Sequence, residues 1–183
     1  MSYTKTIVCL ANSRKLTGRC VAGKEWNGHA AGEWCRPVSA RDRGELTAER
    51  WYARTWRDPR LLDLIEVALL NPHPSGCQTE NHLVDTSVRW KFRGRVTPLC
   101  LVPALDHPEG PLWVNGESTI AGLNDRVTAE VAEAQPRSLV LVQPDRMTIK
   151  LARKAHNLAR RADECADSSP LQVMFTHCRS RTL

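Results

Sequence analysis

Short apolar runs separated by polar or proline-containing clusters are the dominant pattern along this chain. Such runs occur at residues 6–10, 61–70, 98–103, 138–142 and 171–177. Their lengths, and the Asn, Pro and Ser residues that bound them, are typical of β-strands. The run at 61–70 also allows a helix, but the prolines that follow it favour a strand. The pattern therefore predicts a mainly β protein.

Residues 88–96 show the clearest alternation of the chain. In an extended strand, successive side chains point to opposite faces. One face would carry Arg89, Lys91, Arg93 and Arg95, and the other Val88, Trp90, Phe92 and Val96. The apolar face is interpreted as core, with the cations either solvated or lining a groove that follows phosphates, and both interpretations can hold together.

Helical signals are fewer. Residues 46–56 predict one short helix with Trp51 and Trp56 partly exposed. Residues 147–166 are ambiguous, because they alternate at first and then carry a helical apolar stripe. We interpret them as a strand followed by a short helix or a disordered arm near the C-terminus.

Composition excludes several classes of protein. The 183 residues are 42% hydrophobic and 25% charged, as in soluble globular proteins, which excludes disordered, collagen-like and membrane-spanning chains. No apolar run approaches the ~20 residues that cross a bilayer, and no secretory signal is recognisable. We therefore expect a cytoplasmic protein without membrane association.

The net charge of +6 is concentrated in the first 60 residues, where most cations are arginines. Arginine offers a planar fork that matches phosphate oxygens and can stack on bases. A basic cluster of this kind is either a surface for a polyanion or a solvated face.

Neither a metal nor a cofactor is expected. The seven cysteines include no closely spaced pair of the kind that begins a zinc site. Residues 18–24 fit the spacing of a phosphate-binding loop, but Glu25 stands where such a loop needs Ser or Thr. This segment is interpreted as part of a hairpin.

The polar segment 73–82 follows a buried-looking strand and is either a connecting loop or a recognition loop. Gln and Asn amides can read base edges, and His can stack or bind phosphate. A catalytic alternative places Glu80 with His73 or His82 as acid and base, oriented by Asp85 or Asp125.

Four blocks in order along the chain carry a family resemblance. Residues Ile7–Lys15, Gly32–Ser39, Gln78–His82 and Asn124–Val127 resemble bacterial proteins described as a dual OB-fold domain, over roughly residues 5–150. The resemblance implies two small OB-like β-barrels packed together and a role in binding nucleic acid. OB barrels bind single strands in a basic groove with aromatic stacking platforms.

The expected organisation is a first, basic barrel over residues 1–95 and a second over residues 96–183. Two departures concern the second barrel, because residues 152–170 look foreign to it and the chain stops soon after the strand-like run 171–177. The second barrel is then incomplete, altered, or completed by a protein partner or another copy of the chain.

The sequence thus predicts a non-catalytic nucleic-acid-binding module that favours single strands. The alternatives are a metal-dependent nuclease or other enzyme using residues 73–85, and a protein–protein adaptor. Candidate contacts with nucleic acid are Arg14, Lys15, Arg19, Trp34, Arg36, Arg41, Arg43, Gln78, Asn81, His82, Trp90, Lys91 and Arg93.

Overall fold

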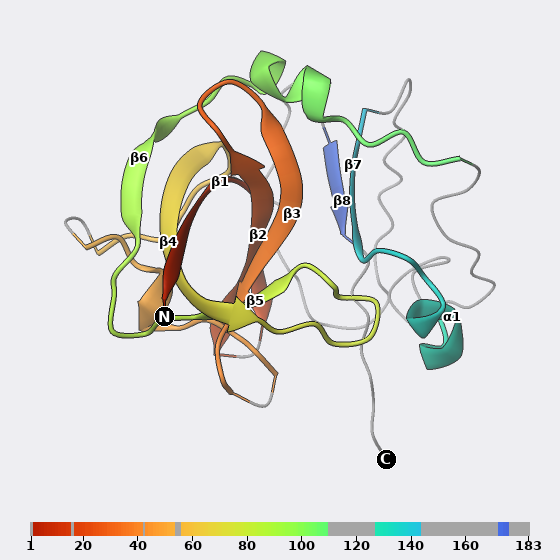
Figure 1. Cartoon of the computed structure of the whole chain (residues 1–183), viewed down its shortest axis with the longest axis horizontal. Helices are drawn as coiled ribbons and strands as arrows, with labels where there is room; N and C mark the ends of the chain where they lie inside the picture. The colour runs from red at the N-terminus through yellow and green to blue at the C-terminus, as the bar shows by residue number, and fades with distance from the viewer. Residues whose placement is uncertain are drawn as a thin grey trace, which may run out of the picture.

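Five strands from the first half of the chain close into a barrel in the computed structural model of the protein (Figure 1). They are β1 (Tyr3–Lys15), β2 (Gly18–Trp26), β3 (Ala31–Val38), β4 (Asp63–Pro72) and β5 (Asn81–Val84). They pair in the order β1-β2-β3-β5-β4, and β1 also pairs with β4 to close the barrel. Every pair is antiparallel except β3 with β5. The predicted mainly β, OB-like fold class is confirmed.

The structure describes residues 2–15, 17–41, 43–53, 56–109 and 127–143, and the backbone of β8 (Gln172–Phe175). The further elements are η1 (Ala48–Arg50), β6 (Lys91–Arg95), η2 (Pro98–Ala104), α1 (Ala129–Glu133) and β7 (Leu139–Val142). β6 pairs with β4, and β7 pairs with β8. Residues 147–166 lie outside the described part, and the boundary at residue 95 stays a prediction. No described helix has the length and hydrophobicity to cross a bilayer.

The barrel interior follows directly from alternation along the strands. Ile7 and Cys9 of β1 and Ile65, Val67 and Leu69 of β4 are fully buried and belong to one apolar cluster. These positions are two residues apart, so they share one face of each strand.

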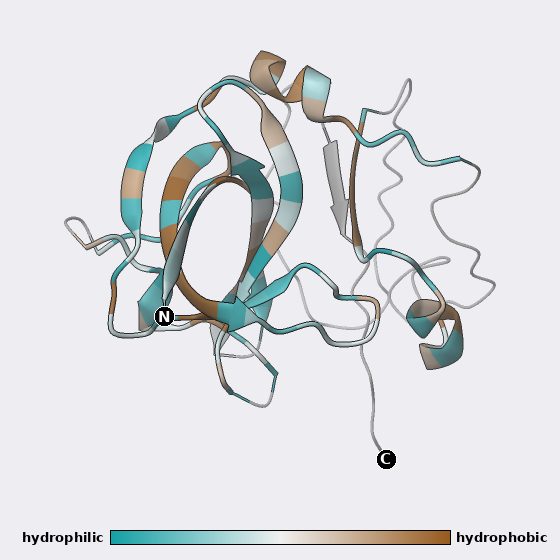
Figure 2. Cartoon of the chain, viewed as in Figure 1, coloured by the Kyte–Doolittle hydropathy of each residue, from teal (hydrophilic) through white to brown (hydrophobic). Residues whose placement is uncertain are grey.

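A second apolar layer covers the outer face of β1. Val8 and Leu10 pack with Leu101 and Ala104 of η2 and with Leu141 of β7. In Figure 2, β4 and β7 are largely hydrophobic, whereas β6 is mostly hydrophilic. η2 and β7 therefore pack against the barrel and bury the outward-facing apolar side chains of β1.

One predicted strand is wrong, because residues 98–103 form the 3-10 helix η2. Pro98 stands in its first turn, where a missing N–H costs nothing. Leu101 and Ala104, three residues apart, are its buried side chains. A short apolar run does not distinguish this spacing from that of a strand.

The predicted helix over residues 46–56 is reduced to η1. Tyr52, which follows it, forms an isolated parallel bridge with Trp90, and both side chains are buried. The two rings belong to the barrel core, so this segment is held by tertiary packing.

Candidate nucleic-acid interface

The segment before β4 is fixed against the β1–β2 hairpin. Asp58 lies 2.8 Å from Arg50 and 3.7 Å from Arg19 of β2. The Asn12 side-chain amide of β1 donates a hydrogen bond of 2.7 Å to the carbonyl of Pro59. Two strands and η1 therefore position residues 56–60.

The buried carboxylate of Asp63 begins β4 and faces two further arginines. Arg57 approaches it at 3.4 Å and Arg95 of β6 at 3.3 Å. The Tyr52 hydroxyl donates to it at 2.8 Å. Burial raises the pKa of Tyr52, and the hydrogen bond to Asp63 raises it further. The phenol therefore stays protonated and holds the carboxylate in place.

Glu66, three residues after Asp63 in β4, is a second carboxylate shared by two cations. It pairs with Lys91 at 2.8 Å and with Arg93, and both cations are about half exposed. Hydrogen bonds from Lys91 and Arg93 hold the pKa of Glu66 below its ordinary value. The carboxylate therefore stays ionised to lower pH than an isolated glutamate does.

We call these groups together the basic band. Its cations are the six that pair with these carboxylates (Arg19, Arg50, Arg57, Lys91, Arg93 and Arg95), together with Arg60, whose backbone N–H donates to Asp63, and Arg89, whose guanidinium lies over Trp56. Each of its three carboxylates, Asp58, Asp63 and Glu66, is shared by two cations. Among the described residues, no carboxylate pairs with Arg60 or Arg89. The band therefore keeps a positive surplus after all its ion pairs are formed.

Aromatic rings are interleaved with the guanidinium groups of the band. Arg50 lies over Trp51 at 5.8 Å, Arg57 over Phe92 at 5.2 Å, and Arg89 over Trp56 at 5.0 Å. These distances are within the range of cation–π attraction. Trp56 is 62% exposed and Phe92 is 46% exposed. The band can therefore meet both phosphates and flat apolar groups.

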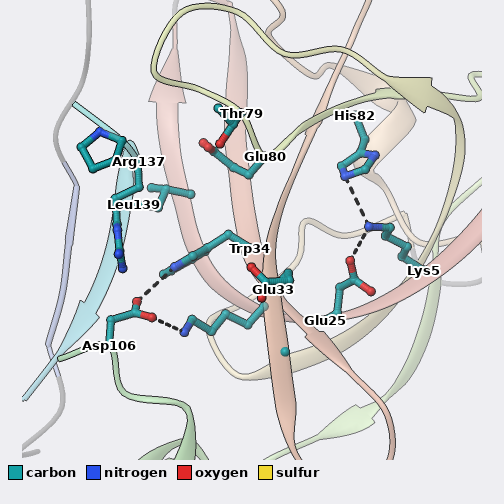
Figure 3. A pocket seen from close by; sticks show the side chains of 13 residues that line it. Lys5, Glu25, Glu33, Trp34, Thr79, Glu80, His82, Asp106, Arg137 and Leu139 are labelled. Atoms are coloured by element: carbon teal, nitrogen blue, oxygen red, sulfur yellow. Dashed lines mark hydrogen bonds and ion pairs between the residues drawn. The ribbon is translucent and has the colours of Figure 1, made fainter. Parts of the chain in front are cut away.

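A cavity of about 620 Å³ lies elsewhere, beside β3 (Figure 3). Its wall includes Lys24, Trp34 and Asp106, which are joined by hydrogen bonds. Lys24 donates to Asp106 at 2.6 Å, and the Trp34 indole N–H donates to it at 3.2 Å. Burial acts to raise the pKa of Asp106, but hydrogen bonds from the Leu141 backbone and Lys24 outweigh it, and the pKa is lowered.

The opposite wall of the cavity carries a second polar chain. Lys5 pairs with Glu25 and lies 3.3 Å from Nε2 of His82, whose Nδ1 is 2.5 Å from the Tyr3 hydroxyl. Burial lowers the pKa of His82, and Lys5 lowers it further. An ammonium can only donate, so Nε2 accepts and the neutral ring carries its proton on Nδ1. The lining carries three cations (Lys5, Lys24 and Arg137) against four carboxylates (Glu25, Glu33, Glu80 and Asp106), so it has no positive surplus, unlike the basic band.

A family comparison agrees with the barrel topology. The model of the dual OB-containing domain matches residues 5–169. The chain belongs to the dual OB-containing domain family. No curated protein and no solved structure matches it.

Two of the blocks that carry the family resemblance meet in this dual OB chain. The parallel pairing of β3 with β5 sets Arg36 beside Asn81. The Arg36 guanidinium lies 2.7 Å from Glu80, and both residues bond to Ser138. Arg36 is only 6% exposed, so it is committed to this buried contact and not to a surface groove.

The predicted contact residues are divided among several places in the dual OB chain. Arg19, Lys91 and Arg93 belong to the basic band, and Arg14 lies directly opposite Arg19 across the β1–β2 pair, with Lys15 next to it. Arg41 pairs with Glu49 at 2.7 Å, and Arg43 is exposed. Trp34 lines the cavity. The predicted contact residues therefore do not gather at a single place.

Several predicted contacts are buried. Trp90 is fully buried in the barrel core, so a stacking role does not fit this structure. His82 and Asn81 are 9% and 4% exposed, and Asn81 donates to the Gln78 side chain at 3.2 Å. Tyr3 and Lys5 hold the His82 ring against β1, so neither this ring nor the Asn81 amide is exposed as a reading edge, whereas Gln78 is half-buried.

The predicted contacts did not include Arg50, Arg57, Arg60 and Trp56, which lie in or beside the basic band. The available signal was the density of arginine and tryptophan between residues 50 and 60. Arg89 and Arg95 were placed on a cationic face but not among the contacts. Among the described residues, no group of three or more His, Cys, Asp or Glu could hold a metal ion.

Proposed function

We propose that this dual OB chain is a non-catalytic nucleic-acid-binding module whose basic band follows a phosphate backbone. The observation that carries the proposal is the surplus of cations in the band after Asp58, Asp63 and Glu66 are each shared by two of them. Neutralising phosphates with such cations releases counterions and favours binding. Family membership is compatible with this role.

Arg60 offers the cleanest test of the proposal. It is exposed, and its guanidinium has no partner among the described residues, so its removal breaks no internal contact. Arg60→Ala should weaken binding two- to five-fold, about 0.5–1 kcal/mol, as for one exposed ion pair. The slope of log K against log salt should become shallower by about 0.7 for a single strand or 0.9 for a duplex.

Fluorescence anisotropy of a labelled oligonucleotide over a salt series measures both quantities. Arg137→Ala is the matched control, because Arg137 is equally exposed but lines the cavity beside β3. It should leave affinity and slope unchanged. Equal effects of the two substitutions, or no strand binding at moderate salt, would contradict the proposal, and the second result would favour a protein–protein adaptor.

The catalytic alternative at residues 73–85 has less support. Glu80 is 9% exposed and its Oε1 accepts from Arg36 and Ser138. His82 contacts Tyr3 and Lys5, so neither group is free to act as a base toward a bound strand. We expect no cleavage when the protein is incubated with labelled strands and Mg²⁺ or Mn²⁺, and metal-dependent nicking lost in Glu80→Ala would restore this alternative.

A further inference from the structure

Trp56 combines exposure with an unusual backbone conformation. Its side chain is 62% exposed, and its φ of 53° lies in the left-handed region. Bulky residues seldom adopt this conformation, and observed cases cluster at binding and switch sites. Burial therefore does not explain why a large indole is held in this position.

The ring is nevertheless held by neighbouring side chains. The Arg89 guanidinium lies 5.0 Å from the ring centroid and is itself bonded to the backbone carbonyl of Ala48. Trp51 approaches edge-on, with 6.3 Å between centroids and 73° between planes. Arg50 in turn lies over Trp51. This arrangement orients the Trp56 ring before any ligand binds and leaves most of its surface open.

We propose that Trp56 is a stacking site for an unpaired nucleobase, placed beside the basic band that binds the phosphates of the same strand. This inference rests on the proposed function and names its substrate class, which is single-stranded nucleic acid. Bases in a duplex are stacked on one another and present only their edges. An unpaired base offers a free π-face, and stacking on an aromatic ring tolerates any base.

The charge around the ring favours a base over an apolar protein partner. Arg89 covers part of the indole, and Arg50 and Arg57 lie over the neighbouring rings Trp51 and Phe92. A protein partner that buried Trp56 would also have to desolvate these cations. A strand brings phosphates to the cations and a base to the ring at the same time.

The decisive comparison uses the full chain and two oligonucleotides of equal length, an oligothymidylate and an abasic strand. Both carry the same phosphates, but only the first has bases. Trp56→Ala should weaken binding of the oligothymidylate by about 5- to 150-fold, as expected for one stacked base, and leave binding of the abasic strand unchanged. Trp56→Phe, which keeps a ring, should retain most of the affinity.

Leu99→Ala is the matched control, because Leu99 is 80% exposed on η2 and outside the basic band. It should change neither affinity. The stacking site would be overturned if Trp56→Ala lost the same affinity for both strands while Trp56→Phe kept native affinity. It would also be overturned if Trp56→Ala lost affinity for neither strand. Either result would leave the proposed function intact. If the native chain binds neither strand, the proposed function itself fails.

Discussion

Replacing Arg36 should lower the stability of the protein and leave the contact of the protein with nucleic acid unchanged. The side chains of Arg36 and Glu80 are 8% and 7% exposed and lie 2.7 Å apart. The Ser138 hydroxyl accepts from Arg36 at 2.7 Å and donates to Glu80 at 2.6 Å. Arg36→Ala leaves the carboxylate of Glu80 buried without its counter-charge, and that loss is the source of the predicted instability.

The expected magnitude follows from the burial of this pair. Truncating one partner of a buried ion pair costs about 3–5 kcal/mol, because the remaining charge is uncompensated. At 2–4 °C per kcal/mol for a chain of this size, the melting temperature should fall by about 6–20 °C. The double variant Arg36→Ala/Glu80→Ala should recover part of the lost free energy of unfolding, because it buries no lone charge.

Urea denaturation gives the free energy of unfolding, and anisotropy at several salt concentrations gives the binding slope. We expect Arg36→Ala to lose much of its stability while its binding slope, measured where the variant is still folded, stays unchanged. A loss below about 1 kcal/mol together with a shallower slope would refute the reasoning, because it would place Arg36 on the nucleic-acid surface.

Two further predictions concern protonation. Burial and Lys5 lower the pKa of His82 from 6.5, so the unfolded chain binds the proton more readily and the free energy of unfolding should fall as pH drops through 6.5. In His82→Gln, the free energy of unfolding measured in urea should therefore change less between pH 7 and 5. A pH profile that this substitution leaves unchanged would argue against the prediction. Burial raises the pKa values of Cys9 and Cys35 to about 12, whereas hydrogen bonds from Thr97 lower that of exposed Cys100. Native iodoacetamide labelling followed by peptide mass mapping should therefore modify Cys100 before these two, and equal rates would contradict it.

Strand positions were predictable because the barrel buries one face of each strand. The apolar run 6–10 lies within β1, and the runs 61–70 and 138–142 overlap β4 and β7, which begin two residues and one residue later. The apolar run ends at residue 10, but β1 continues to Lys15, because the polar residues that follow the run pair with β2 in a hairpin. Cross-strand pairing of a polar segment has no apolar signature in the sequence.

Alternation in residues 88–96 correctly placed Trp90 in the core but not Phe92. The register between β4 and β6 shifts between Leu64 and Ile65, and Gly94 adopts a φ of 137°. The shift lies beyond Phe92 and brings Arg95 to Asp63, whereas Phe92 packs against Tyr52 and is 46% exposed. A bulge depends on the partner strand, so periodicity within one strand does not reveal it.

The sequence shows the excess of cations in the first 60 residues, but not which of these cations pair with carboxylates in the folded chain. Arg36 and Glu80 meet only because β3 and β5 run in parallel. Conversely, Arg95 joins Arg57 at Asp63 from a distant part of the sequence. Which cations remain in surplus is a property of the folded barrel.

Ultraviolet cross-linking of a single strand to the full chain, with mass mapping of the attached peptides, tests the central claim most directly. We predict adducts in residues 47–60 and 88–96, the two segments that carry the rings and most of the cations of the basic band. Adducts confined to the cavity beside β3, at Trp34 and residues 136–139, would contradict it.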